Sequence, residues 1–105
     1  MNRAYLAAAL FYMAAIFALS SLPGSEVGIP APWDKLAHFT EYALLGFLLG
    51  RGTGNVPLAF ALAALYGVSD EVHQAFVPGR EASVFDWLAD AAGALIGALL
   101  AGPRP

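Results

Sequence analysis

The sequence predicts an all-α fold, a polytopic membrane bundle of four transmembrane helices. Hydrophobic residues make up 59% of the chain and charged residues only 12%, and the mean hydropathy is +0.64. Such a composition suits lipid better than water. Nine of the thirteen charged side chains, and both histidines, lie within residues 34–42 and 69–90. Because charges are costly in a bilayer, these two polar segments mark a candidate functional site.

The first helix is predicted over residues 5–22, eighteen residues without a charge. Its length would be about 27 Å, close to the thickness of the hydrocarbon core. A loop rich in proline and glycine follows. The competing interpretation of the first 22 residues is a cleaved signal peptide with Arg3 as its positive segment. Eighteen apolar residues are long for a signal peptide, which favours a retained helix.

Three more helices are predicted over residues 34–50, 56–76 and 84–101, within a single domain that covers residues 1–105. Residues 51–55 break the second helix, and Pro57 suits the first turn of the third. Pro78 and Gly79 end the third helix. Ser83, with Asp86 three residues later, resembles a capping box that opens the fourth.

The basic residues predict the orientation. Arg3, Arg51 and Arg104 fall on one side of a four-span arrangement, and this side is expected to be cytoplasmic, together with both termini. Both polar segments then converge on the outer side. Lys35 and Arg80 depart from the charge rule, which suggests that they pair with carboxylates or bind a ligand.

Helical periodicity places the polar residues on shared faces. In the third helix, Glu71 is rotated away from the face that carries Asp70, which favours Asp70 as the functional acid. Small residues four apart in the second and fourth helices predict close helix packing. The shared faces are, helix by helix, Asp34, Lys35, His38, Glu41 and Tyr42; Asp70, His73, Gln74 and Val77; and Asp86, Asp90, Gly93 and Gly97.

These side chains could act as general acids and bases, or bind an anion. The candidate catalytic residues are His38, Asp70, His73 and Asp86, and the candidate substrate-binding residues are Lys35, Arg80, Tyr42, Gln74 and Asp90. Arg80 precedes a helix N-terminus, where phosphate or carboxylate binding and a salt bridge are equally plausible. For Asp90, a hydrogen bond between helices is weighed against proton transfer. Histidine and carboxylates also suit Zn²⁺ or Mn²⁺, but no close ligand motif is present, so metal and cofactor stay open.

Two further features exclude classes of function. The absence of cysteine excludes disulfides, thiolate catalysis and cysteine-type zinc sites. A net charge of −3 with five scattered basic residues gives no surface for nucleic acid. The expected partners are membrane lipids, and oligomerisation stays open.

The spacing of the polar residues resembles the VanZ-like family of bacterial membrane proteins over about residues 34–101. The resemblance rests on three groups of residues: Asp34, Lys35, His38, Phe39 and Tyr42; Ser69, Asp70, Glu71, His73, Gln74 and Phe76; and Arg80, Ser83, Asp86, Gly93 and Gly97. Where the family often has asparagine, this chain has Asp90. The resemblance implies a multi-pass protein of the bacterial cytoplasmic membrane, in a family named for a member that confers resistance to the glycopeptide teicoplanin.

Three functions are compatible with the sequence. The first is an outward-facing protein that binds or processes an anionic cell-envelope lipid or cell-wall precursor, with a link to glycopeptide resistance. The second is a small proton-coupled multidrug exporter, although the polar residues gather at one end of the helices. The third is a structural or regulatory membrane subunit without its own chemistry. Whether the protein is an enzyme stays open.

Overall fold

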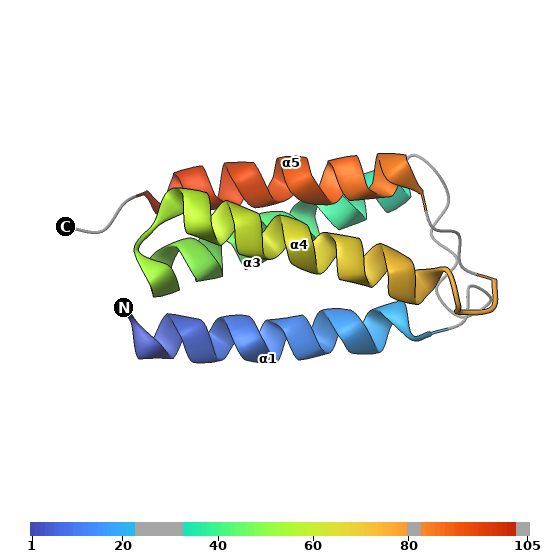
Figure 1. The fold of residues 1–105 in the computed structure, drawn as a ribbon, viewed down its shortest axis with the longest axis horizontal. Coiled ribbons are helices and arrows are strands. Elements are labelled where there is room, and N and C mark those ends of the chain that lie inside the picture. The colour runs from blue at the N-terminus through green and yellow to red at the C-terminus, as the bar shows by residue number, and fades with distance from the viewer. Residues whose placement is uncertain (23–32, 80–82, 103–105) are drawn as a thin grey trace.

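The computed structural model describes residues 1–22, 33–79 and 83–102. This part of the chain forms four helices and no strand: α1 (Arg3–Ser20), α3 (Trp33–Thr53), α4 (Val56–Gln74) and α5 (Val84–Ala101). Successive helices run in opposite directions along one elongated bundle of 45 × 22 × 18 Å (Figure 1). The predicted all-α fold is confirmed.

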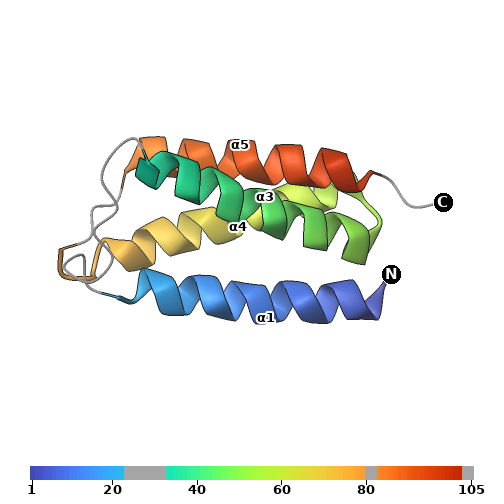
Figure 2. The same cartoon turned by 180° about the vertical axis from the view of Figure 1, so that it is seen from behind.

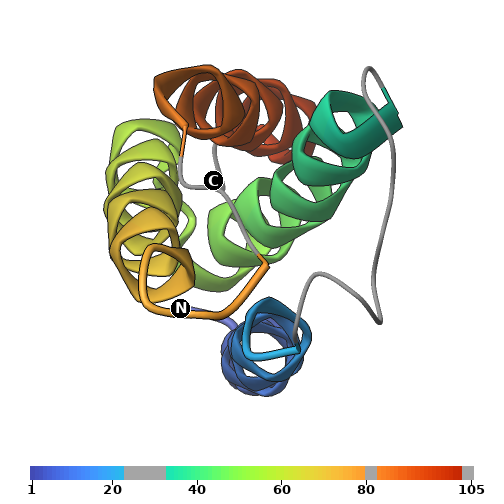
Figure 3. The same cartoon turned by 90° about the vertical axis from the view of Figure 1, so that its right-hand side faces the viewer.

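The antiparallel order gives the bundle two different ends. The last residues of α1 and α4 and the first residues of α3 and α5 lie together at one end, which we call the polar end (Figures 1 and 2). The opposite end, here the terminal end, holds the start of α1 and the end of α5. Seen along the bundle, α3, α4 and α5 form a group, and α1 lies beside it against α3 and α4 (Figure 3).

Side-chain caps explain where the helices begin. Asn2 Oδ1 accepts hydrogen bonds from the backbone N–H groups of Ala4 and Tyr5 at 3.1 and 3.2 Å, so α1 starts two residues earlier than predicted. Asn55 Oδ1 caps α4 in the same way through Leu58 N at 3.0 Å. The predicted starts of α4 and α5 agree with the structure.

The predicted end of α3 at residue 50 is wrong, because the helix continues through Arg51 and Gly52 to Thr53. The Thr53 hydroxyl donates to Leu49 O within the last turn, at 2.8 Å. The helix stops at Gly54, whose φ of 71° lies in the left-handed region that suits glycine. At the polar end, α1 and α4 each end two residues before the predicted boundary, at Ser20 and Gln74.

Glycines set the close approach of α3 and α5. A Cβ atom on Gly97 would lie 1.9 Å from Ala43 O, and one on Gly93 would lie 2.2 Å from Phe39 O. From the other side, a Cβ on Gly46 would lie 2.3 Å from Ala94 O. Any larger residue would push the two backbones apart, so the predicted packing role of these glycines is confirmed.

Apolar side chains lie outside the bundle as well as inside it. The core is built mainly from alanines with a few larger residues, such as Ile16, Tyr42 and Leu45. Many large hydrophobic residues of α1 and α5 are instead exposed: Leu10, Phe11, Phe17 and Leu19, and Leu95, Ile96, Leu99 and Leu100. Surfaces of this kind are typical of lipid contact.

Within the described residues, two helices are long and apolar enough to cross a membrane, α1 and α5, each with a mean hydropathy of 1.6. Both could also be explained without a membrane, since a signal sequence and a buried core helix share these properties. The four predicted helices are therefore confirmed as helices. Length and composition support membrane crossing for α1 and α5 only.

Candidate functional site

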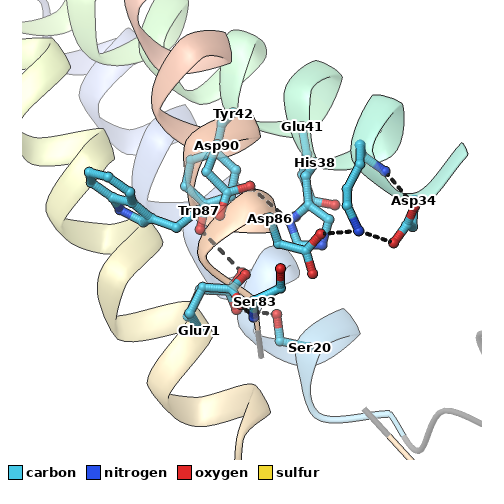
Figure 4. Close-up of polar contacts among 12 residues, drawn as sticks. Ser20, Asp34, His38, Glu41, Tyr42, Glu71, Ser83, Asp86, Trp87 and Asp90 are labelled. Atoms are coloured by element: carbon cyan, nitrogen blue, oxygen red, sulfur yellow. Dashed lines mark hydrogen bonds and ion pairs between the residues drawn. The ribbon is translucent and has the colours of Figure 1, made fainter. Parts of the chain in front are cut away.

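Charged side chains are buried at the polar end of the bundle. Asp90 is fully buried, and Asp70, Asp86 and Glu71 are 5%, 5% and 8% exposed. They come from α4 and α5 and meet residues of α1 and α3 between the helices (Figure 4). The predicted convergence of the two polar segments is confirmed.

His38 and Asp90 connect α3 to α5. His38 Nδ1 lies 2.8 Å from Asp90 Oδ1, and an ionised carboxylate can only accept, so the imidazole N–H donates. The close contact at Gly93 explains the pairing, because it brings α5 against α3 within one turn of both residues. The hydrogen bond between helices that was predicted for Asp90 is present.

Asp70 connects α4 to two other helices. Ser20 of α1 donates its hydroxyl to Asp70 Oδ1. Tyr42 of α3, which is fully buried, donates its hydroxyl to Asp70 Oδ2 at 3.3 Å. Both oxygens of this buried carboxylate therefore accept a hydrogen bond, as buried polar groups require.

Lys35 forms ion pairs at the rim of the site. Its Nζ lies 2.8 Å from Asp34 Oδ2 on the same helix and 2.8 Å from Asp86 Oδ1 on α5. The Lys35 side chain remains 39% exposed, whereas that of Asp86 is 8% exposed. A single lysine thus balances a buried carboxylate and stays accessible from outside the bundle.

The expectation that Glu71 faces away from the site is wrong. Adjacent helical residues point about 100° apart, but α4 packs against α3 on one side and α5 on the other, so Asp70 and Glu71 are both buried. Glu71 Oε2 accepts the backbone N–H of Ser83 at 3.0 Å. The predicted Ser83–Asp86 capping box is therefore wrong in its second half. Ser83 Oγ does accept from Phe85 N, but Glu71 takes the place of Asp86.

Four residues bring their ligand atoms close together. One ligand atom each from His38, Asp70, Glu71 and Asp90 lies within 4.8 Å of the others. An imidazole and three carboxylates are a set that could hold a divalent cation. Sequence reasoning found three of these residues and missed Glu71. Its position beside Asp70 in the second polar segment was the available signal.

His73 and Gln74 are candidate residues that do not belong to this group of four. The His73 ring stacks on Phe17 of α1 with centroids 4.4 Å apart, and its Nε2 lies 3.3 Å from Ser21 Oγ. Gln74 is 3% exposed near the end of α4. Arg80, the predicted anion-binding residue, lies outside the described residues.

A groove that sequence reasoning did not find lies between α4 and α5 beside the site. Its volume is about 390 Å³. Apolar side chains form most of its lining, including Trp87, whose Nε1 donates to Ala64 O at 3.1 Å. Glu71 and Ser83 also line it. The mostly apolar groove therefore extends to the hydrogen bond between Ser83 N and Glu71 at the edge of the buried site.

Comparisons with known proteins give a match to a family model. No curated protein sequence and no solved structure matches the chain. A family model, described as VanZ/LLP1, matches residues 3–102, which is nearly the whole chain. This match extends the sequence resemblance to include α1. The chain belongs to the VanZ/LLP1 family.

Proposed function

We propose that this protein is an integral membrane protein that binds an anionic cell-envelope lipid or lipid-linked cell-wall precursor at its polar end. One observation carries the proposal: the apolar groove between α4 and α5 reaches Glu71 and Ser83, next to a buried cluster of charges. A ligand that fits both parts has an apolar chain and a polar headgroup. Lipids of the cell envelope have this character.

All four helices cross the membrane in this proposal. The lengths of α3 and α4, 21 and 19 residues, correspond to about 32 and 28 Å. The charged residues of α4 at the polar end, Asp70 and Glu71, are buried between helices, as intramembrane charges usually are. Arg3 and Arg51 belong to the terminal end, which the positive-inside rule assigns to the cytoplasm. The polar end then faces outward.

The headgroup would be held at the rim of the site. Lys35 supports this role because its side chain is 39% exposed, and Arg80 is proposed to assist it on the basis of sequence alone. Tyr42, Gln74 and Asp90 remain proposed binding residues. His38, Asp70, His73 and Asp86 are proposed to position the headgroup or transfer protons, which extends binding to processing of the ligand.

Lipid selectivity at Trp87 tests the proposal. With Trp33→Phe as background, Trp87 is the only tryptophan and lines the groove. The protein is placed in vesicles that contain brominated phosphatidylglycerol or brominated phosphatidylcholine. We expect at least about twofold stronger quenching of Trp87 by the anionic lipid, because Lys35 attracts its phosphate. Quenching is measured by steady-state fluorescence.

Two variants that each remove one positive charge serve as the test and its matched control. Lys35→Ala is expected to abolish the preference for the anionic lipid, whereas Arg3→Ala, at the terminal end, leaves it intact. Because Lys35→Ala leaves Asp86 without its cation, the double variant Lys35→Ala/Asp86→Ala is measured beside it. Equal quenching by both lipids in the parent, or an unchanged preference in both Lys35 variants, would refute lipid selection at this site.

A structural or regulatory subunit is the second candidate, favoured by the contacts between helices. His38–Asp90, Lys35–Asp86 and Tyr42–Asp70 each join two helices. If these contacts only stabilise the fold, substitutions there will lower cellular function in proportion to folded protein. A link to teicoplanin resistance and the exporter alternative remain proposals. The ionisable groups gather at one end of the bundle, whereas transporters usually bind at the midplane.

A further inference from the structure

We propose that His38, Asp70, Glu71 and Asp90 bind one divalent cation of the Mn²⁺ or Zn²⁺ class. This inference goes beyond lipid binding and does not depend on it. The four residues come from three helices, α3, α4 and α5, so a bound ion would fasten these helices together at the polar end.

The distances between the four residues suit one small ion. Their ligand atoms lie within 4.8 Å of one another. Nitrogen and oxygen ligands bind Zn²⁺ at about 2.0–2.2 Å, so two ligands of one ion lie at most about 4 Å apart. Side-chain adjustments of less than about 1 Å would complete coordination. Figure 4 shows the side chains of His38, Glu71 and Asp90 reaching from their helices toward the same region.

Two buried oxygens of the group lack a partner, and they are the independent sign of a ligand. Glu71 Oε1 and Asp90 Oδ2 have no hydrogen-bond partner among the described residues. The other oxygen of each carboxylate is occupied, by Ser83 N and by His38 Nδ1 respectively. Glu71 is 8% exposed and Asp90 is fully buried. An unpaired buried carboxylate oxygen is costly, and a cation would satisfy both.

The charges around the group also favour a cation. Three carboxylates lie together and away from water, with one imidazole beside them. The described lysine at this end, Lys35, pairs with Asp34 and Asp86 instead. Among the described residues, no lysine or arginine forms an ion pair with Asp70 or Glu71. A divalent ion would neutralise much of this repulsion, since like charges close together in a low-dielectric region repel strongly.

The donor set selects the class of ion. Imidazole is a good ligand for zinc and other late transition metals, and carboxylates suit Mn²⁺, Mg²⁺ and Ca²⁺. A mixture of one imidazole and three carboxylates therefore favours Mn²⁺ or Zn²⁺ over the two alkaline-earth ions. Because its Nδ1–H donates to Asp90 Oδ1, His38 has Nε2 left to bind the ion, and the hydrogen bond would fix the tautomer and orientation of the ring.

Metal binding to the purified full chain tests the proposal. The protein carries an affinity tag without histidine, is stripped with a chelator in detergent without added lipid, and is titrated with MnCl₂ or ZnCl₂ by equilibrium dialysis. We expect about one bound ion per chain. Loss of a residue that only supports a metal ligand weakens binding by about 10- to 100-fold. Glu71→Gln removes a ligand itself, so we expect it to weaken binding by about 100-fold or more. Asp34→Asn, a carboxylate at the same end outside the group, should bind as the parent does.

The outcomes separate the cation site from its alternatives. Glu71→Gln keeps an acceptor for Ser83 N, and Asp90→Asn is the second variant if the first does not fold. The absence of saturable binding in the parent, or equal affinity in the parent and these variants, would overturn the proposal. Binding that appears only in Arg80→Ala would also overturn it, since the arginine would then occupy the site in the natural protein. Because no lipid is present, failure of lipid selection leaves this result unaffected.

Discussion

Replacing Asp90 with alanine is expected to lower the free energy of unfolding by about 3–5 kcal/mol, the usual loss when one partner of a buried ion pair is removed. Asp90 is fully buried, and its contact with His38 at 2.8 Å joins α3 to α5. Without the carboxylate, the His38 N–H would face a cavity. Unfolding is followed by tryptophan fluorescence in detergent with a chelator present, so that no metal contributes.

A double-mutant cycle isolates the pair. The cycle compares His38→Phe, Asp90→Leu and the double variant His38→Phe/Asp90→Leu, in which both partners are apolar. The double variant should recover much of the stability lost in the two single variants, since a buried pair can be exchanged for apolar packing. Asp34→Ala, at the exposed rim, is the control and should change stability little. If Asp90→Ala behaves like Asp34→Ala, the buried pair does not stabilise the bundle.

Replacing Gly97 with alanine is expected to lower the free energy of unfolding by about 3 kcal/mol, at the upper end of the range for overpacking. Its new Cβ would lie 1.9 Å from the backbone oxygen of Ala43, which cannot move without shifting α3. The same shift would carry His38 away from Asp90. Thermal unfolding in detergent measures the loss, and binding of Mn²⁺ or Zn²⁺ should weaken in the same variant.

The matched control is Gly67→Ala in α4. There the nearest heavy atom to the new Cβ is the Cβ of Asp90 at 3.3 Å, so α5 would need to give way by only a few tenths of an ångström. Both variants make the same chemical change inside a helix, where alanine has the higher helix propensity. Equal losses at the two positions would show that the contact of α3 with α5 is looser than the structure describes.

Local sequence signals were sufficient to predict the helices. Proline and glycine mark the breaks, and Ser83 caps α5 at the predicted position. The end of α3 was predicted too early because residues 51–55, which include Gly52, were expected to break the helix. The backbone of Gly52 remains helical. At the terminal end, Asn2 N donates a hydrogen bond to Gly52 O at 2.8 Å, which joins the start of α1 to the end of α3. This long-range contact leaves no trace in the local sequence.

The candidate site was predictable only in part. Periodicity placed His38, Asp70 and Asp90 on faces that carry several polar residues, and such faces are expected to point inward in a membrane bundle. The same reasoning favoured Asp70 over Glu71, since a single helix does not show that α4 is covered on two sides. The groove between α4 and α5 depends on the relative placement of two helices, and sequence periodicity cannot supply it.

The central claim is that the whole bundle crosses the membrane with its polar end outside, and the crossing of α4 tests it most directly. The chain has no cysteine, so single cysteines can be placed at exposed Phe76, beyond the polar end of α4, and at Thr53, before its other end. A membrane-impermeant maleimide is applied to intact sphaeroplasts. We predict that Phe76→Cys is labelled at once and that Thr53→Cys is labelled only after lysis. Labelling of both positions from the same side would contradict the account.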